Sequence, residues 1–174
     1  MVEHSSISSR SAGFTLIEVI MTLVVVGVLA TIGATVISGG FRNYFLGREI
    51  ARDDAQGRLA LERMSRELRA VRSTADLNIA VANQVSFTHL DGTAIAYRRN
   101  AVTSQLERSQ NGVAGTYQPL ADNVSALTIS YLRNDGITAE TTTPGLVYYV
   151  TVQLTVSTQN VNMTYRSTFK PVVF

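Results

Sequence analysis

The hydrophobic pattern divides the chain into stretches of different character. Between Val19 and Phe41 no residue is charged, and this stretch is long enough for a membrane-spanning helix, which needs about 20 apolar residues. Residues 42–72 are dense in charge, whereas residues 73–174 are rich in Thr, Ser, Val and Asn. The pattern predicts a membrane segment, then an amphipathic helix, then a β-rich domain.

The charged stretch carries an apolar stripe at helical spacing. Its members recur at intervals of three, four or seven positions along one predicted helix face: Ile50, Gly57, Leu61, Met64, Leu68 and Val71. Because no proline occurs before Pro119, we expect one helix of roughly 55 residues, about 80 Å long at 1.5 Å per residue. Gly39, Gly40 and Gly47 leave open whether the helix melts locally near the membrane boundary.

Arginine dominates the polar face of this stretch, with eight Arg against five Asp or Glu between residues 42 and 72. We interpret it as a solvated face with charge pairs along the helix, such as Glu62 with Arg66. The alternative is a surface for DNA or anionic lipid, in which exposed arginines, including Arg98 and Arg99, would converge. Arg42, near the membrane exit, is a candidate headgroup anchor.

The C-terminal stretch changes to a period of two, which is typical of half-buried strands. Asp91 and Gly92 separate two alternating runs and predict a hairpin. The predicted strands cover residues 84–90, 93–99, 105–109, 123–132, 147–157 and 163–169, with the last turn near Gln159 and Asn160. The chain is therefore predicted to be α+β, with a long N-terminal helix packed on a C-terminal antiparallel β-sheet.

The N-terminus reverses the order of a secretory signal. Such a signal places its small-residue cleavage site after the apolar core. Here the small residues 11–13, Ser-Ala-Gly, come before the apolar run, so a cut at this point leaves the apolar segment on the mature chain. Glu18 lies just inside that run, where an ionisable side chain is expensive and marks a candidate functional residue.

Residues 13–18, Gly-Phe-Thr-Leu-Ile-Glu, followed by a long apolar helix, resemble the processing motif of type IV prepilins. The resemblance implies cleavage after Gly13 by a prepilin peptidase, N-methylation of the new terminus at Phe14, and an assembly role for Glu18. The predicted regions are then a leader at 1–13, a membrane or filament-core helix at 14–41, an amphipathic helix continuation at 42–72 and a periplasmic β-rich pilin domain at 73–174.

Charge links the predicted cleavage to the predicted assembly role. Cleavage creates a cationic amine at Phe14, and an isolated charge in lipid is costly. Glu18 on a neighbouring, staggered helix would supply an anion, neutralise both groups and set the axial register between subunits. Gly13 suits the cleavage site because, lacking a Cβ, it lets the backbone fit closely into a protease.

The resemblance implies a structural subunit of a type IV pilus or type II secretion filament. It would wait in the bacterial inner membrane as a single-pass protein, with its C-terminal domain in the periplasm, before entering the filament or reaching the cell surface. Its partners would be other pilin or pseudopilin subunits, prepilin peptidase, the inner-membrane assembly platform and the lipid bilayer. Looser patterns over residues 84–170 resemble minor pilins and the J-class minor pseudopilins of type II secretion. The open alternatives are a minor pilin that captures DNA or a surface, and an anchored protein without a filament role.

No enzyme, cofactor or metal site is predicted. The chain has no cysteine, which excludes disulfides and thiolate metal sites. His89 beside Asp91 is interpreted as a strand-end residue, because no further ligands or nucleophile accompany it. Residues 134–136, Asn-Asp-Gly, with Glu140 lack the spacing of an EF-hand and are interpreted as a turn rather than a calcium site.

Overall fold

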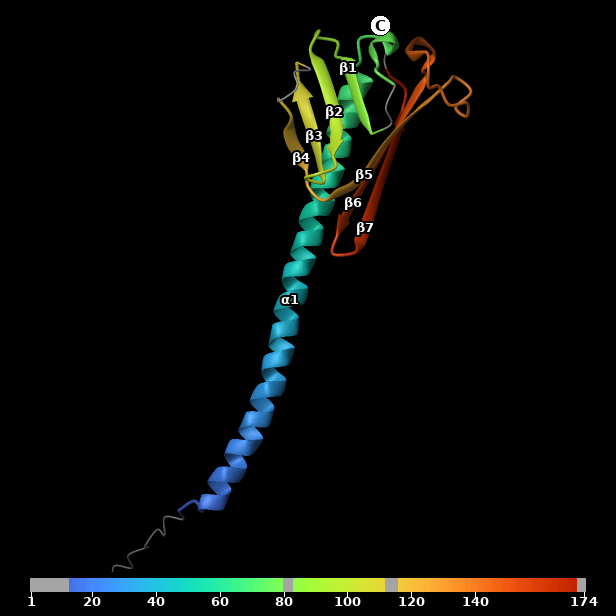
Figure 1. Ribbon diagram of the computed structural model, residues 1–174. Coiled ribbons are helices and arrows are strands. Elements are labelled where there is room, and N and C mark those ends of the chain that lie inside the picture. The colour runs from blue at the N-terminus through green and yellow to red at the C-terminus, as the bar shows by residue number, and fades with distance from the viewer. Residues whose placement is uncertain (1–12, 80–82, 112–115, 172–174) are drawn as a thin grey trace, which may run out of the picture. The chain divides into compact units, whose positions relative to one another are not determined.

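The computed structural model describes residues 13–79, 83–111 and 116–171 (Figure 1). The chain divides into two compact units, residues 1–45 and 46–174. One helix, α1, belongs to both units, because it runs from Leu16 to Arg69.

The predicted long helix is confirmed. α1 (Leu16–Arg69) contains 54 residues and is continuous through Gly39, Gly40 and Gly47, so these glycines do not melt it. It ends shortly before a 3-10 turn, η1 (Thr74–Asp76), that Ser73 caps by accepting a hydrogen bond from the backbone N–H of Ala75.

In the first unit, α1 is apolar and exposed. Every described residue from 13 to 45 is exposed except Gly33, which is half-buried. The helix is long and apolar enough to cross a membrane. Its hydroxyl groups are satisfied locally, because Thr22, Thr31 and Thr35 each donate to a backbone carbonyl about one turn earlier, over 2.7–2.9 Å. Such bonds remove the penalty of a bare hydroxyl in hydrocarbon.

The second unit contains two antiparallel sheets, which Figure 1 labels by strand. The first sheet has the order β1-β2-β3-β4, with β1 (Gln84–Thr88), β2 (Ala94–Asn100), β3 (Gln105–Gln110) and β4 (Gln118–Ala121). The second has the order β5-β6-β7, with β5 (Val124–Leu132), β6 (Tyr149–Thr158) and β7 (Val161–Phe169). A second 3-10 turn, η2 (Pro144–Leu146), precedes β6.

The α+β prediction is confirmed, with two differences in detail. The hairpins turn where expected. Gln159 and Asn160 both have positive φ and form a two-residue turn between β6 and β7, whereas Gly92, also at positive φ, lies in the longer loop between β1 and β2. The strands form two sheets rather than one. The short β4 was not predicted, since Pro119 interrupts its pattern, and it lies at a sheet edge, where proline is tolerated.

The predicted stripe of α1 forms part of the core of the second unit. Leu61, Met64 and Leu68 are buried, and Val71 after the helix is buried with them. They join side chains of both sheets in one hydrophobic cluster. The same part of α1 also bonds to both sheets, through Glu67 to β2 and β3 and through Asp54 to β7.

Gly57 is a point of close approach between α1 and the second sheet. A Cβ at this position would lie 2.9 Å from Tyr165 Cε2 and 3.0 Å from Val156 Cγ2.

We expect Gly57→Ala to lower the free energy of unfolding by roughly 1 to 2 kcal/mol, because overpacking outweighs the gain in helix propensity. Gly47→Ala is the matched control: a Cβ there meets nothing within 4 Å, and we expect it to stabilise by about 0.5 to 1 kcal/mol. Urea denaturation of both variants tests this, and equal effects would refute the close approach.

Candidate processing and assembly segment

The helix that follows the predicted cleavage site begins with a polar cap. Thr15 Oγ1 accepts a hydrogen bond from the Glu18 backbone N–H at 3.3 Å, and the Thr15 carbonyl accepts from the Val19 N–H at 3.2 Å. Thr15 and Glu18 have the spacing of a capping box. Glu18 also places negative charge in the first turn, where the helix dipole favours it. Sequence reasoning missed this role of Thr15, although the Thr-x-x-Glu spacing signals it.

Gly13, Phe14 and Glu18 lie together at the start of α1, and all three are exposed. A Cβ built on Gly13 meets nothing within 4 Å, so no contact within this chain requires glycine at this position. The Phe14 side chain is 79 % exposed and does not pack on its own chain. These residues are therefore accessible to other molecules. A requirement for glycine at position 13 would come from such a molecule and not from the residues that the structure describes.

The other end of the apolar segment carries an aromatic group beside Arg42. Phe41, Tyr44 and Phe45 are exposed, and the rings of Tyr44 and Phe45 meet edge to face with centroids 5.7 Å apart. Aromatic rings and arginines gather where a membrane meets water. Arg42 is exposed on the same turn of α1, and its role as a headgroup anchor stays a prediction.

The prokaryotic N-terminal methylation motif matches residues 8–34 of this chain. The chain is prepilin-like. The match begins in the predicted leader, includes Gly13, Phe14 and Glu18, and extends into the apolar helix. No curated protein matches the chain.

The motif fixes the broad class of the prepilin-like chain. Proteins that carry it are structural, so the chain is not an enzyme. The motif implies processing by a prepilin peptidase and assembly with other pilins. Together with the apolar helix that follows, it indicates anchoring in the inner membrane before filament assembly.

The arginines named in the DNA alternative do not converge. Arg98 pairs with Glu107 at 2.8 Å and lies over the Tyr117 ring, whereas Arg99 donates to the Val124 carbonyl at 2.8 Å. As neighbours on β2 they point to opposite faces of the sheet. Arg98 and Arg99 therefore do not form part of one common surface for DNA.

Charge pairs do occur along α1, as the solvated-face interpretation expects. Arg58 pairs with Asp54 and Arg63 pairs with Glu67, each at a separation of four residues. The particular pair predicted between Glu62 and Arg66 is not among the ion pairs of residues 13–79, 83–111 and 116–171.

A half-buried charge network ties α1 to the first sheet, and sequence reasoning missed it. Glu67 Oε2 accepts from Arg108 Nε at 2.9 Å and from the Tyr97 hydroxyl at 2.7 Å, while Oε1 accepts from Arg63 Nε at 3.1 Å. Burial disfavours the charged form, but the hydrogen bonds from Arg108, Tyr97 and Arg63 outweigh it and hold the pKa of Glu67 below its usual 4.5. The network holds the last turns of the helix against β2 and β3.

The residues considered for calcium are used by the chain itself. Asp135 accepts from the backbone N–H groups of Ile137 and Thr138, which closes a turn as interpreted from the sequence. Glu140 is buried and accepts from Arg133 and from the backbone N–H groups of residues 142 and 143. Within the described part of the chain, no group of three His, Cys, Asp or Glu side chains could hold a metal ion.

Glu140 gives the folded domain a dependence on acid. Hydrogen bonds from the backbone N–H groups of Thr143 and Thr142, aided by Arg133, lower the pKa of Glu140 from 4.5 to about 2. Its contribution to stability is therefore complete above pH 4.5 and is lost as the pH falls toward 2. We expect Glu140→Gln to have a lower free energy of unfolding than the wild type at neutral pH. The difference between the two proteins should become smaller as the pH falls from 4.5 toward 2.

Denaturation midpoints measured at neutral pH and at about pH 3 test the Glu140 prediction. Glu62→Gln is the control, because Glu62 is exposed and makes no ion pair among the described residues. If the difference in denaturation midpoint between the wild type and Glu140→Gln is the same at both pH values, the prediction is wrong.

Proposed function

We propose that this chain is a minor structural subunit of a type IV pilus or type II secretion filament. The observation that carries the proposal is the methylation motif at residues 8–34, which overlaps the start of a long apolar helix. The described residues of the first unit are all exposed except the half-buried Gly33. An exposed apolar helix of this length needs lipid or other helices around it. A filament core of packed helices and a bilayer both meet that need.

The proposal assigns a role to each residue of the processing segment. A prepilin peptidase cuts after Gly13 and methylates the new terminus at Phe14. Glu18 of one subunit then pairs with the Phe14 amine of a neighbour and sets their axial register. Arg42 anchors the helix at the headgroups while the subunit waits in the bacterial inner membrane.

The proposed regions follow from these roles. Residues 1–13 form the cleaved leader, 14–41 the membrane and filament-core helix, 42–72 its amphipathic continuation, and 73–174 the periplasmic pilin domain. Partners are other pilin or pseudopilin subunits, prepilin peptidase, the inner-membrane assembly platform and the lipid bilayer.

A minor rather than a major subunit is supported by the C-terminal domain. It lacks the cysteines that form the disulfide loop of many major pilins, and its strand patterns over residues 84–170 resemble minor pilins and J-class pseudopilins. Quantitative mass spectrometry of filaments sheared from the native host tests this. We expect the chain in far fewer copies than the most abundant pilin. Its absence would refute the filament role, and its presence as the most abundant subunit would refute the minor one.

A further inference from the structure

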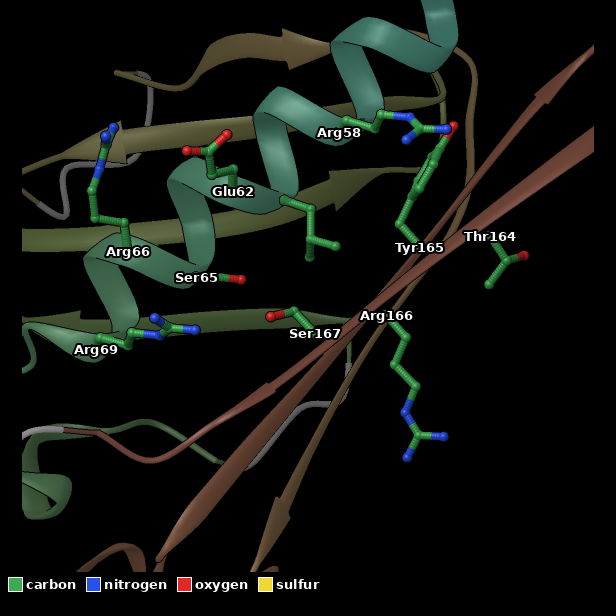
Figure 2. A pocket seen from close by; sticks show the side chains of 10 residues that line it. Arg58, Glu62, Ser65, Arg66, Arg69, Thr164, Tyr165, Arg166 and Ser167 are labelled. Carbon is green, nitrogen blue, oxygen red and sulfur yellow. The ribbon is translucent and has the colours of Figure 1, made fainter.

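A groove of about 730 Å³ runs between the last turns of α1 and strand β7, wholly within the second unit (Figure 2). The residues that line it are Arg58, Leu61, Glu62, Ser65, Arg66, Arg69, Thr164, Tyr165, Arg166 and Ser167. Figure 2 shows Ser65 and Ser167 pointing toward one another from the two walls, whereas Arg166 points away from the helix.

The groove is closed at both ends and open in the middle. At one end the Tyr165 hydroxyl bonds to Asp54, and Arg58 lies 5.6 Å from the Tyr165 ring centroid. At the other end Arg69 lies 5.5 Å from the ring centroid of Phe169. Between these contacts the small side chains of Ser65 and Ser167 face one another from the two walls (Figure 2).

Strand β7 is the edge of its sheet. It pairs with β6 on one side, and no strand or isolated bridge among the described residues pairs with its other side. The outer edge of such a strand presents N–H and C=O groups that can template another strand. The β7 edge therefore adds backbone bonding capacity along one wall of the groove.

A polar group in the groove lacks a partner. Ser65 is 6 % exposed, and its Oγ makes no hydrogen bond with any described residue. Buried hydroxyls nearly always find a partner, because an unsatisfied one has lost its hydrogen bonds to water without replacement. An occupant that brings a donor or acceptor to Ser65 would supply the missing hydrogen bond.

The charge around the groove is positive. Arg58 is neutralised by Asp54 at 3.0 Å, but Arg66, Arg69 and Arg166 have no carboxylate partner among the described residues. Glu62 is the acidic residue among those that line the groove. The surroundings therefore favour an occupant that carries carboxylates.

We propose that the β7 edge binds an extended, acidic segment of a partner protein, which adds a fourth strand to the β5-β6-β7 sheet. The side chains of an added strand alternate between its faces. One set would enter the groove above Leu61 and Ser65, and the other would lie beside Arg166 on the opposite face of the sheet. Apolar or small residues suit the first set, and carboxylates suit the second. This inference concerns the folded domain and is independent of the proposed filament role.

A nucleic acid fits the groove less well than a peptide. Single strands bind through bases stacked on aromatic faces. The ring at the groove, Tyr165, is already engaged by Asp54 and Arg58. The free edge of β7 also offers a row of backbone groups that a peptide can match residue by residue.

Peptide binding to the full chain in detergent micelles tests the proposal. The probe is a fluorescent peptide of 9 residues, the length of β7, with alternating Val and Glu. We expect measurable binding by fluorescence anisotropy, and protection of β7 amides in hydrogen exchange. A peptide of alternating Val and Lys, and a Val-Glu peptide with N-methylated backbone amides, should each bind at least about tenfold more weakly.

A pair of charge reversals locates the site. Arg166→Glu should weaken binding of the Val-Glu peptide at least about tenfold. Arg52→Glu changes the net charge equally and is the control, because Arg52 is exposed, lies outside the groove and approaches Asp122 only to 3.9 Å. Unchanged hydrogen exchange of β6 in both variants shows that the fold is intact.

The outcomes separate the proposal from its rivals. Equal loss of binding in Arg166→Glu and Arg52→Glu would overturn it, because net charge alone would then explain binding. Equal binding of the Val-Glu and Val-Lys peptides would also overturn it, because non-specific hydrophobic binding would then be sufficient. A single-stranded oligonucleotide that protects β7 where the Val-Glu peptide does not would also overturn it, and would favour nucleic acid at this groove.

Discussion

Replacing Glu18 by Ala should abolish incorporation of this chain into filaments while leaving its insertion into the membrane intact. The proposed pair joins Glu18 to the Phe14 amine of a neighbour in an environment that excludes water. Removing one partner of such a pair leaves an unpaired charge and costs about 3 to 5 kcal/mol, enough to reduce assembly more than a hundredfold. Membrane insertion depends on the uncharged stretch from Val19 to Phe41, which the change leaves untouched. Immunoblots of membranes and of sheared filaments measure the two effects separately.

Two further variants separate charge from capping, because the Glu18 backbone N–H donates to the Thr15 hydroxyl and the two residues have capping-box spacing. Glu18→Gln keeps a residue that suits the box but removes the negative charge, so we expect it to fail in assembly as Ala does. Thr15→Ala removes the cap and keeps the charge, so it should still assemble, with a helix start weakened by about 1 kcal/mol. Normal filaments from Glu18→Gln would show that the register role is wrong.

Replacing Glu67 by Ala should lower the free energy of unfolding of the second unit by about 3 kcal/mol. The change leaves the Arg108 guanidinium, only 14 % exposed, without its carboxylate, and it removes the acceptor of the Tyr97 hydroxyl. An uncompensated buried charge is the reason for the large effect. Urea denaturation of the full chain in detergent, followed by tyrosine fluorescence, measures it.

Glu62→Ala is the matched control for Glu67, because it removes the same side chain from the same helix at an exposed position. We expect a change within about 0.5 kcal/mol. A Glu67→Ala variant as stable as Glu62→Ala would mean that the network contributes nothing to the attachment of α1.

The helix and its buried stripe could be predicted because their signals are local. Leu61, Met64 and Leu68 repeat at helical spacing, and no glycine or proline stops the helix early. The hairpin that contains Asp91 and Gly92 is equally local, because its turn is closed by hydrogen bonds within residues 89–93 and Gly92 supplies the positive φ. Such features depend on neighbours in sequence, and a pattern read along the chain captures them.

Features that depend on distant residues escaped prediction. Glu67 meets Tyr97 and Arg108, which lie 30 and 41 positions away, and nothing in the helical pattern distinguishes it from Glu62. The strands themselves pair with their neighbours in sequence, but the break between β4 and β5 that divides them into two sheets was not predicted. The groove beside β7 exists because two elements approach without filling the space between them, which no residue pattern encodes.

The processing segment is the opposite case, because its chemistry is contained in consecutive residues. Gly13, Phe14 and Glu18 were named from the sequence, and the structure places all of them exposed at the start of α1. What the structure adds is that a Cβ at Gly13 would meet nothing within 4 Å among the residues it describes, so a requirement for glycine there would come from a second molecule. That molecule, in our proposal, is the prepilin peptidase.

Mass spectrometry of the mature N-terminus, on chain purified from membranes of the native host, tests the central claim most directly. The account predicts a protein that lacks residues 1–13 and begins with an N-methylated Phe14. A mature chain that begins at any other residue, or at an unmethylated Phe14, would contradict it.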